Sequence, residues 1–209
     1  MRESGSRFSI GRSRSCWRFS SIGPSGHARC GRPRRSQARS IRAAATLSDS
    51  DEIVVVGSQA ILGQFPDAPA ELLRSMEAGV YSRAWPSRSD LIDGSIGEGS
   101  PFHQTFGYYA QGVAPETALL PPGWEERAIR VYSPATRGAT GLALEVHDLL
   151  VSKYAAGREK DREFARAVFR LGMARARTVL ELLPLAPLGA ERLAAALAAV
   201  EADARQPQD

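Results

Sequence analysis

The sequence predicts an α/β (α+β) fold, with a small sheet, flanking helices and a helical C-terminal part. The first observation is a β-branched run from Glu52 to Gly57, which follows turn residues and is typical of a buried strand. The second is a change of pattern at His147, after which apolar residues recur at helical spacing. Strand patterns followed by helix patterns are the element order of such a domain.

Short helices and short strands are expected before the helical part. Ser40 to Leu47 has the pattern of a short helix, and residues 48–51 predict the turn that precedes the first strand. Ser100 and Pro101 are typical of an N-cap with proline at the first helical position, so a helix is expected to run to about Tyr109. The other expected elements are helices that start near Gln59 and Pro66, and strands over Ser75–Tyr81, Ala128–Ser133 and Leu142–Val146.

The C-terminal part is expected to hold successive helices. Gly157 is placed to interrupt the first of them, and Pro184 and Pro187 to end the next. Gly189 to Ala204 predicts a final helix. The apolar faces of these helices are defined by Leu150, Tyr154, Phe164, Val168, Leu171, Leu193, Leu197 and Val200.

The charge of the chain is unevenly placed. The formal net charge is +4, yet residues 1–45 hold 11 arginines and a single acid, Glu3. The remainder holds 16 Lys and Arg against 22 Asp and Glu, so its net charge is negative. The basic character of the chain belongs to its N-terminal tail and does not predict a nucleic-acid-binding domain.

Residues 1–40 are rich in Ser, Arg and Gly and lack a periodic apolar pattern, so a disordered tail is expected. Three explanations stay open: a non-native upstream start codon in a GC-rich genome, a basic tail that contacts nucleic acid, or a transit peptide. The globular domain is expected over residues 41–209, with its C-terminal helices at about 147–204.

Cysteine usage and hydropathy predict a protein of the reducing cytoplasm with no membrane association. No apolar run approaches the roughly 20 residues of a membrane span. Both cysteines, Cys16 and Cys30, lie in the tail, and their spacing fits no zinc pattern. The expected domain contains no cysteine at all.

The strand end at Gly57 and Ser58 is the first candidate site. A strand that ends in Gly-Ser and enters a helix presents free backbone N–H groups, and the glycine lets a phosphate approach the backbone closely. Most such turns are only tight connections, so the structural and the functional interpretation both stay open.

Acidic residues supply the second candidate. Glu77 and Gly79 fall on the same face of an expected strand. Two carboxylates at this spacing commonly hold divalent cations for phosphoryl transfer, but here only one is present. Farther along, Asp90, Asp93 and Glu98 crowd a Gly/Ser-rich segment, which fits either turn and capping chemistry or a loop beside a polar pocket.

Both lysines of the chain, Lys153 and Lys160, lie in one short segment, whereas every other cation is an arginine. On a continuous helix they would share a side with Gly157 and Asp161. A charged, solvated helix face is the common explanation of such a segment. The alternative is a triphosphate site, because a flexible ammonium binds phosphate as a point charge.

These motifs together resemble a family. The order GSQAIL, an E-x-x-V-Y strand, DLIDGSIGEGSPFH with FGYYAQGV, PPGWEER and HDLLVSKYAAGREKDREF is similar to bacterial nucleotidyltransferase-fold proteins of poorly known function related to the AbiEii toxin. The resemblance runs from about Ile41 to about Leu183. The GREKD segment and the GSQAIL turn are its most specific parts.

The resemblance implies a nucleotidyltransferase core, a small mixed sheet with helices, that uses Mg²⁺ and a nucleoside triphosphate. It implies that Gly57 and Ser58 hold the triphosphate and that Glu77 binds Mg²⁺ together with a later acid, for which Glu145 is the candidate. It also implies that Ser58, Glu77 and Lys153 converge in space. The further residues to which it gives phosphate-binding or catalytic roles are Lys153, Lys160 and Asp161.

One position departs from the family pattern. The family reads Glu-Ala-Asp in the strand, and this chain reads Glu77-Ala78-Gly79. Losing a metal ligand commonly removes orders of magnitude of rate, because the ions orient the phosphates and offset developing charge.

Two functions therefore follow from the sequence. The first is Mg²⁺-dependent transfer of a nucleoside monophosphate to a protein or RNA hydroxyl, impaired at Gly79. The second is a non-catalytic member that binds a nucleotide or a cognate partner protein in a toxin–antitoxin-like pair. An acid such as Asp90 or Asp93 placed near Gly79 would favour the first.

Overall fold

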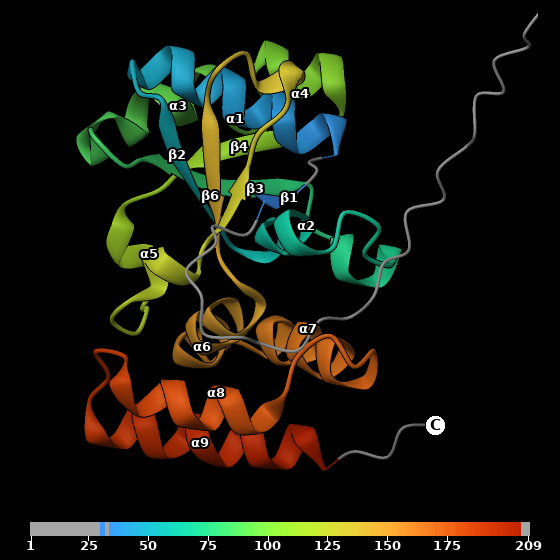
Figure 1. The fold of residues 1–209 in the computed structure, drawn as a ribbon, viewed down its shortest axis with the longest axis vertical. Coiled ribbons are helices and arrows are strands. Elements are labelled where there is room, and N and C mark those ends of the chain that lie inside the picture. Colours follow the sequence, from blue (N-terminus) through green and yellow to red (C-terminus); the bar gives the residue numbers. More distant parts are fainter. Residues whose placement is uncertain (1–29, 32–33, 206–209) are drawn as a thin grey trace, which may run out of the picture.

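The computed structural model describes residues 30–31 and 34–205. Within this part of the chain, a six-stranded mixed sheet has the order β1-β5-β6-β2-β3-β4. Helices flank the sheet, and a helical layer follows it at the C-terminus (Figure 1). The predicted α/β class and the helical C-terminal part are confirmed.

The centre of the sheet is β2 (Glu52–Val56), whose last four residues are buried. It pairs parallel with β6 (Thr140–Ala143) and antiparallel with β3 (Glu77–Ser82). β4 (Tyr109–Gly112) adds parallel to β3 at one edge. At the other side β5 (Ile129–Val131) pairs antiparallel with β6, and β1 (Cys30–Gly31) pairs parallel with β5.

Helices α1 (Arg35–Ser48) and α3 (Ser89–Ile96) pack on the sheet and on each other, and α4 (Pro101–Phe106) lies beside α3 (Figure 1). Ile41 of α1 is fully buried and would collide with any side chain at Gly141, so α1 lies directly on β6. The remaining short elements are η1 (Ser58–Ala60), α2 (Ile61–Gln64), η2 (Ala70–Leu73), η3 (Pro86–Arg88), η4 (Pro115–Thr117), α5 (Trp124–Arg127) and η5 (Pro134–Thr136).

The C-terminal layer consists of α6 (Val146–Ala156), α7 (Glu159–Arg170), α8 (Ala176–Leu182), η6 (Leu183–Leu185) and α9 (Ala190–Ala204). Figure 1 shows these helices stacked away from α1 and α3. A buried carboxylate holds α9 to the layer: Asp203 accepts hydrogen bonds from Tyr154 Oη at 3.2 Å and from Arg162 Nη2 at 2.8 Å. Because α9 supplies the acid and α6 and α7 the donors, these three helices form one packed unit.

Three sequence-based boundaries are wrong, each for a local reason. Gly107 adopts a left-handed conformation, so α4 ends at Phe106, and Tyr109 begins β4, a strand that the sequence did not predict. Residues 89–96, interpreted as a Gly/Ser-rich loop, form α3. β6 ends at Ala143, because the side chain of Glu145 accepts a hydrogen bond from His147 N and caps α6.

The first helix begins earlier than the expected Ser40. α1 begins at Arg35, and within its first turns Gln37, Ala38 and Ser40 are buried. Cys30–Gly31 forms β1. The remaining prediction for the tail falls on residues 1–29 and 32–33, which lie outside the described residues.

None of the helices that the structure describes combines the length and the apolar character needed to cross a membrane.

Candidate functional site

The turn after β2 carries Gly57 and Ser58. Gly57 has a φ of 71°, a backbone conformation that L side chains rarely adopt, although a Cβ there would meet nothing within 4 Å. Ser58 begins η1, and α2 follows directly. Since these helical segments are three and four residues long, the helix dipole contributes less here than the sequence suggested.

Lys153 of α6 reaches this turn. Its Nζ donates to Ser58 Oγ at 3.0 Å and to Asp161 Oδ1 at 2.8 Å, and it lies 4.4 Å from the centre of the Phe164 ring. Lys153 is only 7% exposed. The ammonium is therefore fully engaged by protein groups and ties the β2–η1 turn to α6 and α7.

Asp161 is the shared acid of this cluster. Its second carboxylate oxygen accepts from Arg158 Nε at 2.6 Å, and the residue is 3% exposed. Burial lowers the pKa of Lys153, and this outweighs the opposite effect of Asp161. Burial acts to raise the pKa of Asp161, but its hydrogen bonds to Lys153 and Arg158 leave that pKa below the ordinary value.

Gly157 explains why this cluster forms on two helices and not on one. It adopts a φ of 68° and ends α6, with its N–H donating to Lys153 O. The chain then restarts as α7 with Arg158 as its N-cap. The predicted interruption at Gly157 is therefore confirmed, and the two lysines do not share one continuous helix face. The break lets Asp161 turn back toward Lys153, while Lys160 stays exposed.

A cavity of about 1200 Å³ lies between the β2–η1 turn, the start of β3, the end of β4, and helices α6 and α7. The structure brings six of the seven predicted site residues to this cavity. They are Gly57, Ser58, Glu77, Lys153, Lys160 and Asp161. Their roles stay predictions, but their convergence is a fact of the fold.

Glu77 and Gly79 lie on the cavity side of β3. Gly79 pairs with Val56 of β2 and with Gln111 of β4, so it sits between two strands. A Cβ at Gly79 would lie 3.0 Å from Val56 Cγ2, which is a tight contact that a small shift of the valine would relieve. Position 79 therefore faces the cavity and supplies no carboxylate to it.

The residues present do not fit the paired-metal site that the resemblance implies. In the part of the chain that the structure describes, no group of three or more His, Cys, Asp or Glu side chains is arranged to hold a metal ion. Asp90 and Asp93 lie on α3 and do not line the cavity, so neither of them replaces the acid lacking at Gly79. Two-metal phosphoryl transfer needs several carboxylate oxygens, and Glu77 offers one carboxylate.

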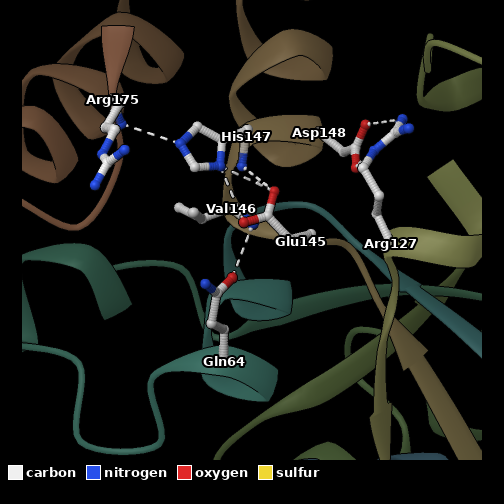
Figure 2. A network of polar contacts seen from close by, with 7 residues as sticks. All are labelled: Gln64, Arg127, Glu145, Val146, His147, Asp148 and Arg175. Carbon is white, nitrogen blue, oxygen red and sulfur yellow. Dashed lines mark hydrogen bonds and ion pairs between the residues drawn. The ribbon is translucent and has the colours of Figure 1, made fainter. Parts of the chain in front are cut away.

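Glu145, the seventh predicted residue, does not line this cavity. Its carboxylate caps α6 by accepting from His147 N at 2.9 Å, and it also contacts His147 Nδ1 at 3.0 Å (Figure 2). His147 Nε2 accepts from Arg175 N at 3.0 Å, so Nδ1 carries the ring hydrogen and donates it to Glu145. The observed contacts of Glu145 are those of a positioning residue at the start of α6.

Figure 2 shows two further contacts at the same helix start. Val146 N donates to Gln64 Oε1 at 3.1 Å, which links α6 to α2. Arg127 donates twice to the fully buried Asp148, at 2.8 and 2.7 Å. Burial raises the pKa of Asp148, against the effect of Arg127. These contacts fix the start of α6 against α2 and α5, and so help to position Lys153.

Several cavity residues were not predicted from the sequence. Six cations and four acids line the cavity. Two of the cations, Lys153 and Lys160, were predicted, and the other four are Arg74, Arg158, Arg166 and Arg170. Arg166 and Arg170 lie four residues apart on α7 and share a helix face, but they follow Lys160 by six and ten residues, so the face of Lys160 did not indicate them. Arg74 precedes β3, and nothing in the sequence marks it.

Comparison with protein families agrees with this geometry. Residues 38–168 match the model of a family described as a nucleotidyltransferase of unknown function. The chain belongs to this family. The match runs from within α1 through most of α7 and contains every cavity residue except Arg170, while α8 and α9 lie beyond it. No curated protein and no solved structure matched the chain.

Proposed function

We propose that the cavity binds the triphosphate of a nucleotide and that this member of the family performs little or no transfer of its own. The observation that carries the proposal is the common cavity of the Gly57-Ser58 turn, Glu77 and the cationic start of α7. These parts come from distant positions of the chain, and a shared surface of this kind supports a shared ligand.

The size and charge of the cavity support an anionic ligand. Ligand pockets commonly measure roughly 300–1,000 Å³, and this cavity, at about 1200 Å³, has room for a nucleotide. Its six cations outnumber its four acids, although residues 46–209 as a whole are net acidic. An excess of positive charge in a cavity of an acidic domain favours a phosphorylated ligand.

We expect weak transfer of the nucleoside monophosphate because the cavity lacks the second acid expected at position 79. Moving a nucleoside monophosphate requires groups that offset the charge that develops on the phosphates, and paired carboxylates with their metal ions commonly supply them. Here Gly79 stands where the second acid is expected, and Asp90 and Asp93 do not line the cavity. The acceptor, whether a protein or RNA hydroxyl, and a cognate partner protein in a toxin–antitoxin-like pair remain predictions of the resemblance. So does the relation to AbiEii.

Calorimetric titration tests the proposal. Each of ATP, GTP, CTP and UTP, its monophosphate and its nucleoside should be titrated into the full chain. We expect the affinity to fall in the order triphosphate, monophosphate, nucleoside for at least one base. A parallel assay with α-labelled triphosphates, Mg²⁺, cell RNA and lysate protein should show little transfer.

A blocking variant locates the binding. Ala114 is exposed and lines the cavity, so Ala114→Trp should abolish triphosphate binding by filling the space. Ala135→Trp is the matched control, because Ala135 is also exposed but lies outside the cavity. Equal binding by both variants would place the ligand elsewhere and contradict the proposal.

A further inference from the structure

We propose that Arg74 and Lys160 form a phosphate clamp that holds the end of the polyphosphate chain without a metal ion. The inference rests on the proposed function and adds to it the residues that contact phosphate and the form of the ligand that is bound. It assigns Lys153 a different part, that of a positioning residue.

The ion pairs of the cavity cations single out these two residues. Lys153 and Arg158 both bind Asp161, at 2.8 and 2.6 Å. The other two engaged cations are Arg166, which binds Glu159 at 2.7 Å, and Arg170, which binds Glu71 at 2.5 Å. With the described part of the chain, Arg74 and Lys160 form neither an ion pair nor a side-chain hydrogen bond, and both are exposed.

Arg74 and Lys160 reach the cavity from different elements. Arg74 lies between η2 and β3, and Lys160 lies in the first turn of α7. The bond from Arg170 to Glu71 joins the C-terminal end of α7 to η2, so it holds together the two cavity walls that carry Lys160 and Arg74, at the end of α7 opposite Lys160. A di- or triphosphate is a compact chain of anionic oxygens, and it suits two cations that approach from separate walls.

The effect of Glu77 on phosphate binding distinguishes a clamp without metal from a site that uses a metal ion. It is the carboxylate that β3 presents to the cavity, and the described residues hold no acid cluster that would bind a metal. If a metal ion bridged Glu77 to phosphate, Glu77 would strengthen binding. In a clamp without metal, its negative charge opposes the phosphates and weakens binding.

The test is calorimetric titration of inorganic tripolyphosphate and of ATP, GTP, CTP and UTP into the full chain, with EDTA and separately with Mg²⁺. The clamp predicts binding in EDTA. We expect about tenfold weaker binding for Arg74→Ala and for Lys160→Ala, because each substitution removes one charged contact to phosphate. Glu77→Gln should bind more tightly than the parent in EDTA. Arg177→Ala, at a side chain that is 90% exposed and outside the cavity, should bind like the parent.

The outcomes separate the clamp from the proposed function. Triphosphate binding that appears only with Mg²⁺ and is lost in Glu77→Gln would overturn the clamp and leave nucleotide binding intact. If the triphosphate binds in EDTA and neither Arg74→Ala nor Lys160→Ala weakens that binding, the assignment of the clamp to these two residues is overturned. No binding of any nucleotide under either condition would overturn both proposals. Arg74→Gln and Lys160→Gln, which remove the charge but keep a polar side chain, guard against an effect on folding, and unfolding curves should match the parent.

Discussion

Lys153 Nζ lies 3.0 Å from Ser58 Oγ, although 95 positions separate the two residues in the chain. The same ammonium is held by Asp161 and lies over the Phe164 ring. This contact joins the turn after β2 to the helical layer, so it positions two walls of the cavity. A compact ammonium on a flexible stem makes three contacts in different directions, which a planar guanidinium does not reproduce.

The two lysines should therefore differ sharply in their effect on stability. Lys153→Ala leaves Asp161 with half of its buried ion pairing, and breaking a buried pair costs about 3 kcal/mol. Lys160→Ala removes an exposed side chain and should change the free energy of unfolding by less than about 0.5 kcal/mol. Urea unfolding of both variants measures the difference. Similar losses for both would contradict the buried role of Lys153.

Acid should weaken the protein partly through Asp161. Because Lys153 and Arg158 hold its folded-state pKa below the ordinary 3.8, folding favours the ionised carboxylate. This stability is fully present above pH 3.8 and is lost as the pH falls through the folded-state pKa. In urea unfolding at a series of acidic pH values, the free energy of Asp161→Asn should fall less steeply than that of the parent. Parallel pH dependences would show that Asp161 is not the titrating group.

Gly79→Asp should restore an acid to the cavity side of β3 and raise transfer in the presence of Mg²⁺. The added Cβ lies 3.0 Å from Val56 Cγ2, so we also expect a loss of stability of about 1 kcal/mol. Gly79→Asn carries the same steric change without the charge. A turnover assay that shows a gain for Gly79→Asp and none for Gly79→Asn supports the account. Robust turnover by the parent would contradict the proposal that this chain performs little or no transfer.

Truncations should mark where the folded domain begins. Deleting residues 1–29 leaves every described element in place, and we expect little change in the thermal midpoint. Deleting residues 1–40 removes the first turns of α1 and the buried Ala38, so the midpoint should fall by several degrees. Calorimetric melting compares the two. A large drop in the shorter deletion would show that the removed residues stabilise the domain.

Local patterns predicted the fold where one signal dominated. The β-branched run of β2 and the periodic apolar faces of α7 and α9 needed no tertiary information. β4 was missed because its first residue lies in an aromatic stretch that continues the pattern of α4, and the left-handed Gly107 between them was not recognised. α3 was missed because its glycine and serine residues favour loops, whereas its buried Ile92 and Ile96 anchor it in the core.

The candidate site was predictable where residues join turns to strands, as at Ser58 and Glu77. The pairing of Lys153 with Asp161 was not, because it depends on the break at Gly157 and on burial between helices. Arg74 could not be singled out from the sequence for a similar reason. It stands out only because most cations around it are paired with acids, and the tertiary structure sets those pairs. Glu145 caps α6 and lies outside the cavity, and the sequence did not predict this because a helix cap and a metal ligand call for the same residue type.

The most direct test of nucleotide binding in this cavity is amide hydrogen exchange, measured by mass spectrometry with and without saturating nucleoside triphosphate. The account predicts slower exchange in the peptides that contain Gly57–Ala60 and Arg158–Asp161, and unchanged exchange in α4, which does not line the cavity. Protection confined to α4, or unchanged exchange at the β2–η1 turn under saturation, would contradict it.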